Sequence, residues 1–217
     1  MKKPLSESTI SSVLSFSHRF LRSTDLARDF NDPNGIEGYC LTDFARSCLN
    51  RISDGLRDGS TRRAWRLTGD FGSGKSSFAL LLANTLRDVK GRLPKRLRDE
   101  VLNEIPAAAK NHYQPVLVVA NRERMGPAVL RAFLSTLAEV FPRGAKSSIE
   151  NQVNAALQRD DLSDKEALEL IAGCVTKIVD SGKADGVLLI LDEAGKFLEY
   201  AALNPDKQDV FFLQQLA

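Results

Sequence analysis

The spacing of apolar and polar residues predicts a chain in which short strands alternate with helices. Three segments are predicted to be strands: Ala64–Thr68, Pro115–Ala120 and the run that begins at Gly186 and ends at Gly195. The second and third are almost continuously apolar, as expected of parallel strands that are buried on both faces. Strands that alternate with helices are typical of a parallel sheet between helical layers, so the sequence predicts an α/β fold.

Helices are predicted where apolar residues recur three and four positions apart. Thr42 is expected to cap one helix, and Ser163 another, through a capping box with Glu166. Pro94 and Pro127 are expected in the first turns of two more helices. The predicted helical segments are residues 5–30, 42–52, 76–87, 94–105, 127–141, 147–157, 163–182 and those from about 206 onward.

The order of these elements predicts two parts. Residues 1–60 form an N-terminal helical segment, and residues 61–217 form the core of the fold. The gap between the second and third strands is long and helical, so residues from about 121 to 185 are interpreted as a helical insertion within that core. A chain of 217 residues is long enough for one such domain.

Composition narrows the class of protein. The formal net charge is only +2, which makes no case for a nucleic-acid or membrane-surface protein. No apolar run approaches the ~20 residues of a membrane span. The three cysteines, Cys40, Cys48 and Cys174, lack metal-ligand spacing and are interpreted as reduced thiols. The sequence therefore predicts a cytoplasmic protein without a membrane partner.

A glycine-rich loop follows the first predicted strand. Residues 69–76 match the phosphate-loop pattern G-x-x-x-x-G-K-[ST], known as Walker A, at every fixed position. A side chain at Gly74 would block the approach of the backbone to phosphate, and the helix that follows directs its unpaired N–H groups at the anion. Lys75 is expected to reach the β- and γ-phosphates, and Ser76 to ligate Mg²⁺. The predicted ATP-binding residues of the loop are Gly69, Asp70, Phe71, Gly72, Ser73, Gly74, Lys75, Ser76 and Ser77.

Two carboxylates follow the third predicted strand. Asp192 and Glu193 come directly after a fully apolar run, downstream of the glycine loop. A buried strand would deliver Asp192 to the phosphate site, where its carboxylate can hold Mg²⁺. Glu193 would then orient and deprotonate water, so Glu193 and Lys75 are the predicted catalytic residues.

With both motifs in place, the chain resembles P-loop NTPases of the branch that has an additional catalytic glutamate, which includes the AAA+ and STAND ATPases. The resemblance implies a three-layer α/β/α core with a parallel sheet, ATP and Mg²⁺ as ligands, and ATP hydrolysis. The guanine signature N-K-x-D is absent, which favours ATP over GTP. The longer patterns RDFNDPNGIEGY, AWRLTGDFGSGKSSFALLLA and LILDEAGKFLEY resemble large bacterial ATP-binding proteins of anti-phage and restriction-type systems.

The resemblance also suggests adenine contacts. In AAA+ proteins a segment before the first strand often packs on the adenine, and Ile36 or Tyr39 would supply that contact here. The alternative interpretation is a loop whose tyrosine fills the core.

Several elements of the family pattern are not found in this sequence. In this branch a strand that carries a polar sensor residue, a helical lid and often an arginine finger follow the acidic pair. The chain is therefore expected to be an N-terminal fragment of a larger ATPase, with an exposed apolar slot in its sheet and weak or no hydrolysis of its own. Self-association or binding to other subunits would occur through the missing regions.

Basic residues leave nucleic acid open as a partner. The cluster from Lys90 to Arg98 is interpreted as a solvated surface or, alternatively, as a phosphate-contacting track. Arg122 and Arg124 follow the second strand and would either pair with neighbouring acids or touch a partner. Trp65 is expected in the core.

The expected function is ATP-driven conformational change or remodelling in a multi-component system, with a defence role suggested by the resemblance. A nucleotide-gated assembly switch with little turnover and a DNA-stimulated motor subunit are the alternatives. A scaffold that binds no nucleotide is disfavoured by the presence of Lys75, Ser76 and both acids.

Overall fold

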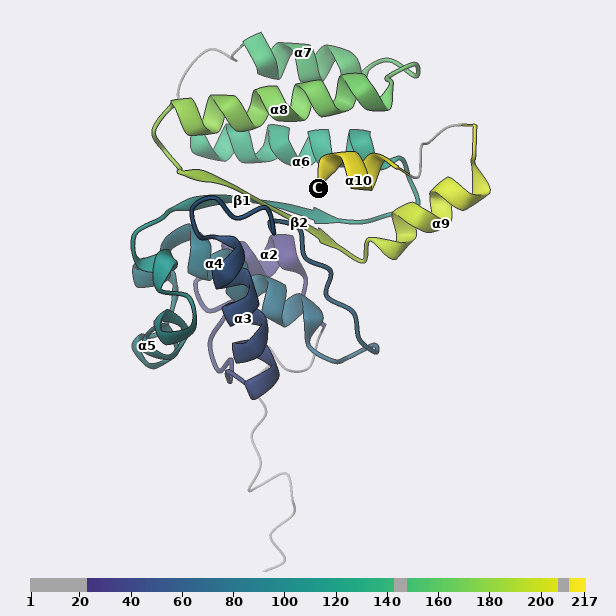
Figure 1. The fold of residues 1–217 in the computed structure, drawn as a ribbon. Helices are drawn as coiled ribbons and strands as arrows, with labels where there is room; N and C mark the ends of the chain where they lie inside the picture. Colours follow the sequence, from purple (N-terminus) through teal and green to yellow (C-terminus); the bar gives the residue numbers. More distant parts are fainter. Residues whose placement is uncertain (1–22, 143–147, 207–210) are drawn as a thin grey trace, which may run out of the picture.

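The computed structural model describes residues 23–142, 148–206 and 211–217. Most of the helix predicted in residues 5–30 lies outside the described residues, as do residues 207–210 of the last predicted helix. Within the described ranges the chain is a mixed α/β structure with a parallel sheet (Figure 1). No helix in these ranges combines the length and apolarity needed to cross a lipid bilayer.

The sheet of the described chain has two strands. Strand β1 (Tyr113–Val119) pairs in parallel with β2 (Gly186–Asp192), in a register that runs from Tyr113 opposite Gly186 to Val119 opposite Asp192. These are the second and third predicted strands, so both predictions are confirmed. Strand β2 ends at Asp192, whereas the predicted strand runs to Gly195, because the chain turns at Glu193.

The prediction of a strand at Ala64–Thr68 is wrong. The segment has no strand assignment, and its residues are exposed except for the half-buried Leu67. Trp65 is 39% exposed and does not belong to the core, which also contradicts the sequence analysis. A strand exists only where a neighbour accepts and donates its backbone hydrogen bonds, and neither described strand pairs with this segment. The three-layer core with this third strand is therefore not formed by the described residues.

Helices cover both faces of the two strands. Alternate residues of a strand point to opposite faces. On one face, Leu117, Leu188 and Ile190 pack in one apolar cluster with α2–α5. On the other face, the cluster formed with α6–α10 includes Val116, Val118, Val187, Leu189 and Leu191. The layered α/β architecture is thus confirmed at this coarser level.

The first face carries α2 (Leu26–Asn31), α3 (Asp43–Gly55), α4 (Lys75–Arg92), α5 (Lys95–Glu104) and the 3₁₀ turn η2 (Pro106–Ala109). Thr42 caps α3 as predicted, since its hydroxyl accepts a hydrogen bond from Ala45 N at 3.2 Å. Helix α4 is longer than predicted, although its backbone breaks at Asp88, where φ is −166° and ψ is 86°.

The second face carries α6 (Met125–Val140), α7 (Ser148–Leu157), α8 (Asp164–Asp180), α9 (Gly195–Leu203) and α10 (Phe212–Leu216). The predicted capping box is confirmed at the start of α8, where Ser163 Oγ accepts from Glu166 N at 3.2 Å. The described part of residues 121–185 holds three helices, and these pack as a layer on one side of the sheet (Figure 1).

Side-chain contacts fix the direction of α4 relative to the strands. Near the end of this helix, Arg87 donates to His112 Nε2 at 2.8 Å and to Gln114 Oε1. Those partners lie at the beginning of β1, so α4 runs opposite to the strands that it contacts. Twelve helical residues span about 18 Å, and a seven-residue strand spans about 20 Å. The first turn of α4 is therefore level with the carboxyl ends of β1 and β2.

The Arg87–His112 contact predicts a pH dependence of stability. Burial, followed by the charge of Arg87, lowers the pKa of His112 from its ordinary value of 6.5. Because His112 Nε2 accepts a hydrogen bond from a guanidinium, the imidazole binds a proton less readily in the folded chain than in the unfolded chain. The free energy of unfolding should therefore fall as the pH drops below about 6.5.

Urea unfolding of the wild type and His112→Gln between pH 5 and 7.5 measures this effect. Glutamine keeps an acceptor for Arg87 and does not titrate, so the variant should lose less stability on acidification. Identical pH profiles for the two proteins would contradict the prediction.

Candidate functional site

The glycine loop lies at the start of α4, as predicted. Gly72 and Gly74 have φ values of 79° and 84°, in the left-handed region that glycine adopts without steric cost. Gly74 is the residue before the helix, and no side chain caps the first N–H groups of α4. The loop is exposed to solvent, and Phe71 at its tip is 98% exposed. Uncapped N–H groups at an open helix start are suited to binding an anion.

Lys75 is the first residue of α4, and its ammonium group is held inside the loop. Lys75 Nζ donates to the carbonyl oxygens of Gly69 at 2.8 Å and Asp70 at 2.7 Å, and lies 3.4 Å from Ser73 Oγ. All three partners are uncharged oxygens. Phosphate oxygens carry charge and would form stronger hydrogen bonds with the same ammonium group.

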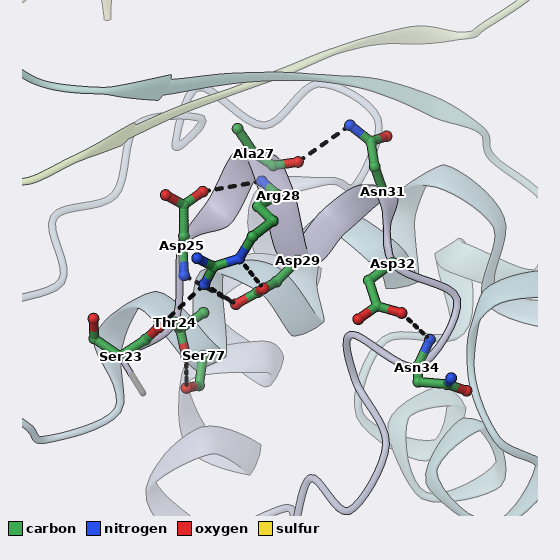
Figure 2. Close-up of polar contacts among 10 residues, drawn as sticks. All are labelled: Ser23, Thr24, Asp25, Ala27, Arg28, Asp29, Asn31, Asp32, Asn34 and Ser77. Carbon is green, nitrogen blue, oxygen red and sulfur yellow. Dashed lines mark hydrogen bonds and ion pairs between the residues drawn. The ribbon is translucent and has the colours of Figure 1, made fainter. Parts of the chain in front are cut away.

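The first turn of α4 also carries two hydroxyl groups. Ser76 and Ser77 are both half-buried. Ser77 Oγ lies 2.9 Å from Thr24 Oγ1, so the N-terminal segment is hydrogen-bonded to the turn that follows the loop (Figure 2). At the other end of α4, Arg92 donates to the carbonyl oxygen of Phe30 and its guanidinium lies 4.0 Å from the ring centre. Residues 24–30 thus contact α4 near both ends of this helix.

The acidic pair lies at the carboxyl end of β2. Asp192 alternates with Leu188 and Ile190, so it is on the face of the sheet that α4 covers. Asp192 Oδ1 accepts from the backbone N–H of Glu193 at 3.0 Å. Glu193 has a φ of 55°, which makes it the one non-glycine residue in the left-handed region within the described ranges. Its carboxylate forms an ion pair with Lys196.

The structure therefore brings the two sequence motifs to the same end of the sheet. The first turn of α4 and Asp192 lie at the carboxyl ends of the strands and on the same face. Ligands of parallel α/β sheets bind at this edge. The two motifs are separated by more than a hundred residues in the sequence, and the packing of α4 on both strands accounts for their common location.

The available donors fit a nucleotide with Mg²⁺. A Cβ atom on Gly72 or Gly74 would meet no atom within 4 Å, so the loop is open at both positions. Ser76 and Asp192 offer the hydroxyl and carboxylate oxygens that Mg²⁺ prefers. Across the described ranges, no three His, Cys, Asp or Glu side chains are grouped to hold a metal by themselves. A magnesium site built from one or two protein ligands and substrate phosphates agrees with that donor set.

Ile36 and Tyr39 lie on the α4 side of the sheet. Ile36 is 3% exposed and belongs to the apolar cluster of α2–α5, against which the half-buried Tyr39 packs. Burial, followed by the charge of Cys48, raises the pKa of Tyr39 to about 12. Both residues have core positions, in agreement with the alternative interpretation, and their contact with adenine stays a prediction.

Four arginines of the two basic groups outside the loop have partners within the chain. Arg96 pairs with Glu100 at 3.3 Å, and Arg98 donates to the Lys90 carbonyl oxygen at 3.2 Å. Arg122 pairs with Glu199 at 3.0 Å, and Arg124 with Asp164 at 3.3 Å. These contacts favour the interpretation of both groups as internally paired surface charges.

Sequence reasoning did not identify two polar residues of this region, Thr24 and Lys196. Thr24 is 53 residues from Ser77, and a single hydroxyl group forms no sequence pattern that would predict their contact. Lys196 carried a usable signal, because it follows Glu193 by three residues, which is the spacing of paired side chains on a helix. No protein-family model, curated protein or solved structure matches this chain.

Gly74 provides a test of the loop geometry. Gly74→Ala should lower the free energy of unfolding by about 1 kcal/mol, because an alanine at a φ of 84° is strained. Gly195→Ala is the matched control, since Gly195 begins α9 with open space around its Cβ position. The control should raise stability by up to about 0.5 kcal/mol, as expected of alanine in a helix. Urea unfolding of the two variants should give shifts of opposite sign, and a Gly74→Ala protein as stable as the wild type would contradict the assigned loop conformation.

Proposed function

We propose that this chain is an ATP- and Mg²⁺-binding domain of the P-loop NTPase branch that has a catalytic glutamate, and that it hydrolyses ATP. The observation that carries the proposal is the shared position of the two motifs. The glycine loop with the first turn of α4, and the Asp192–Glu193 pair, lie at the same end of the sheet.

In this proposal the loop and α4 bind the phosphate chain. Backbone N–H groups of the loop and of the first turn of α4 donate to phosphate oxygens. Lys75 leaves the carbonyl oxygens of Gly69 and Asp70 and donates to the β- and γ-phosphates. The charge of the ligand then offsets the unfavourable position of a cation at a helix N-terminus.

Ser76 and Asp192 hold Mg²⁺, which neutralises charge on the phosphates when it is bound. Glu193 orients a water molecule and accepts its proton during attack on the γ-phosphorus. Glu193 follows Asp192 directly in the chain, so the base would lie beside the metal ligand. Arrangement and electrostatics, more than covalent chemistry, supply the rate in reactions of this type.

Association with other subunits is part of the proposal. Within the described residues β2 pairs on one edge only, and most of its side chains are half-buried rather than buried. Parallel strands are usually covered on both faces, and an unpaired strand edge can pair with another chain. The proposed role is a conformational motor in a larger assembly, and the sequence resemblance suggests a defence role for it.

Lys75→Ala tests the phosphate site. Loss of the ammonium group should weaken the binding of Mg²⁺–ADP by about 100-fold, as expected of a lost charge-assisted contact with phosphate. Lys95→Ala is the matched control, because Lys95 begins α5 just as Lys75 begins α4, without a glycine loop. Isothermal titration calorimetry measures both affinities. Tight binding by Lys75→Ala would remove the site assignment.

Glu193→Gln separates binding from chemistry. The variant should still bind nucleotide, without loss of affinity, and should lose turnover by about 100-fold or more, since a general base contributes roughly that factor. Single-turnover hydrolysis with the chain in excess of ATP detects slow rates, and duplex DNA is added in a parallel series. Normal turnover in Glu193→Gln would remove Glu193 from its role.

Turnover raised by DNA would favour a motor on nucleic acid, and binding with negligible turnover in the wild type would favour a nucleotide-gated switch.

A further inference from the structure

Lys196 lies beside the acidic pair at the carboxyl end of β2, although neither sequence motif includes it. It is the second residue of α9, three positions after Glu193. Its ammonium group pairs with the Glu193 carboxylate, and its backbone N–H donates to the Glu193 carbonyl oxygen at 2.9 Å. The chain turns directly from the end of β2 into α9, so this pair is at the carboxyl end of the strand, next to Asp192.

The position of Lys196 is electrostatically unfavourable for a lysine. The N-terminus of a helix carries partial positive charge and favours anions. The first turn of α9 contains no acidic residue, so Glu193 supplies the nearby negative charge from outside the helix. Both side chains are partly exposed, at 41% for Lys196 and 47% for Glu193. An exposed ion pair of this kind is weak and exchanges its partners readily.

The same arrangement occurs at the glycine loop. Lys75 also lies in the first turn of a helix, and its ammonium group is also bound by oxygens of the preceding turn. Two helices that start at the carboxyl end of the sheet, α4 and α9, therefore each carry a lysine in the first turn, where the helix dipole disfavours its charge. A polyanion at the carboxyl ends of the strands would be attracted by both dipoles and by both ammonium groups.

We propose that Lys196 binds the γ-phosphate, and that it does so by exchanging the Glu193 carboxylate for phosphate oxygens. This inference rests on the proposed function. A terminal phosphate carries about two negative charges and a carboxylate carries one, so the exchange is favourable when ATP is present. The exchange frees Glu193 to orient water. With ADP there is no γ-phosphate, and Lys196 stays paired with Glu193. Lys196 thus distinguishes ATP from ADP.

Nucleotide affinity tests this role without reference to turnover. Calorimetric titrations with Mg²⁺–ADP and with the Mg²⁺ complex of β,γ-imido-ATP are compared for the wild type, Lys196→Met and Lys196→Arg. Lys196→Met should weaken binding of the ATP analogue by about tenfold, as expected of one lost charge-assisted contact, and change ADP affinity by less than about twofold. Lys196→Arg should restore most of the analogue affinity.

Two further variants make the test specific. Lys165→Met is the matched control, because Lys165 is also the second residue of a helix and also pairs with a glutamate, Glu169, at 3.9 Å. It should bind both nucleotides as the wild type does. Glu193→Gln removes the competing carboxylate, so analogue binding should tighten, and this gain should disappear when Lys196→Met is added.

The outcomes are distinguishable. Equal weakening of ADP and analogue binding by Lys196→Met, unchanged binding of both, or tighter binding of the analogue would overturn the role of Lys196 while the proposed function stands. A wild-type chain that binds neither nucleotide would overturn the proposed function, and this inference with it.

Discussion

Helix α4 is held by contacts on almost every side, and its burial determines where the glycine loop lies. Leu80, Leu81 and Leu86 are at most 1% exposed, and each such side chain contributes about 1.5–3 kcal/mol through removal from water. The buried polar groups of Asn84 and Thr85 donate to carbonyl oxygens of the same helix, so they need no partner elsewhere. A helix held this firmly presents its first turn at a fixed place beside the strands.

The ends of α4 are fixed by polar contacts that complement this burial. Arg87 and Arg92 bind the start of β1 and the end of α2, and Ser77 binds Thr24 at the opposite end. Arg92, which belongs to the predicted basic cluster, therefore has a structural role, because its guanidinium holds α2 against α4. The loop itself has few contacts, and its Phe71 is almost fully exposed. A rigid helix behind an open loop is the arrangement expected of a preorganised anion site.

Much of this arrangement follows from the sequence, and the exceptions have physical causes. The apolar runs at 115–120 and 186–195 predicted strands to within a few residues, because buried parallel strands need continuous apolar side chains. Thr42 and Ser163 were predictable because capping depends on neighbours in the sequence. Residues 64–68 have strand-like composition, but pairing depends on a partner that the segment cannot specify alone. The left-handed backbone of Glu193 could not be predicted, because a non-glycine residue rarely adopts it.

The register of the two strands also constrains how the chain folds. Tyr113 and Gly186 are paired, yet the whole layer of α6, α7 and α8 lies between them in the sequence. The entropy lost in closing so long a loop must be offset before any β1–β2 hydrogen bond forms. Helices α6 and α8, which pack on each other and on the strands, shorten that loop when they condense. We therefore expect the sheet to pair late in folding, after local helical contacts, and the shared location of Asp192 and the first turn of α4 to form with it.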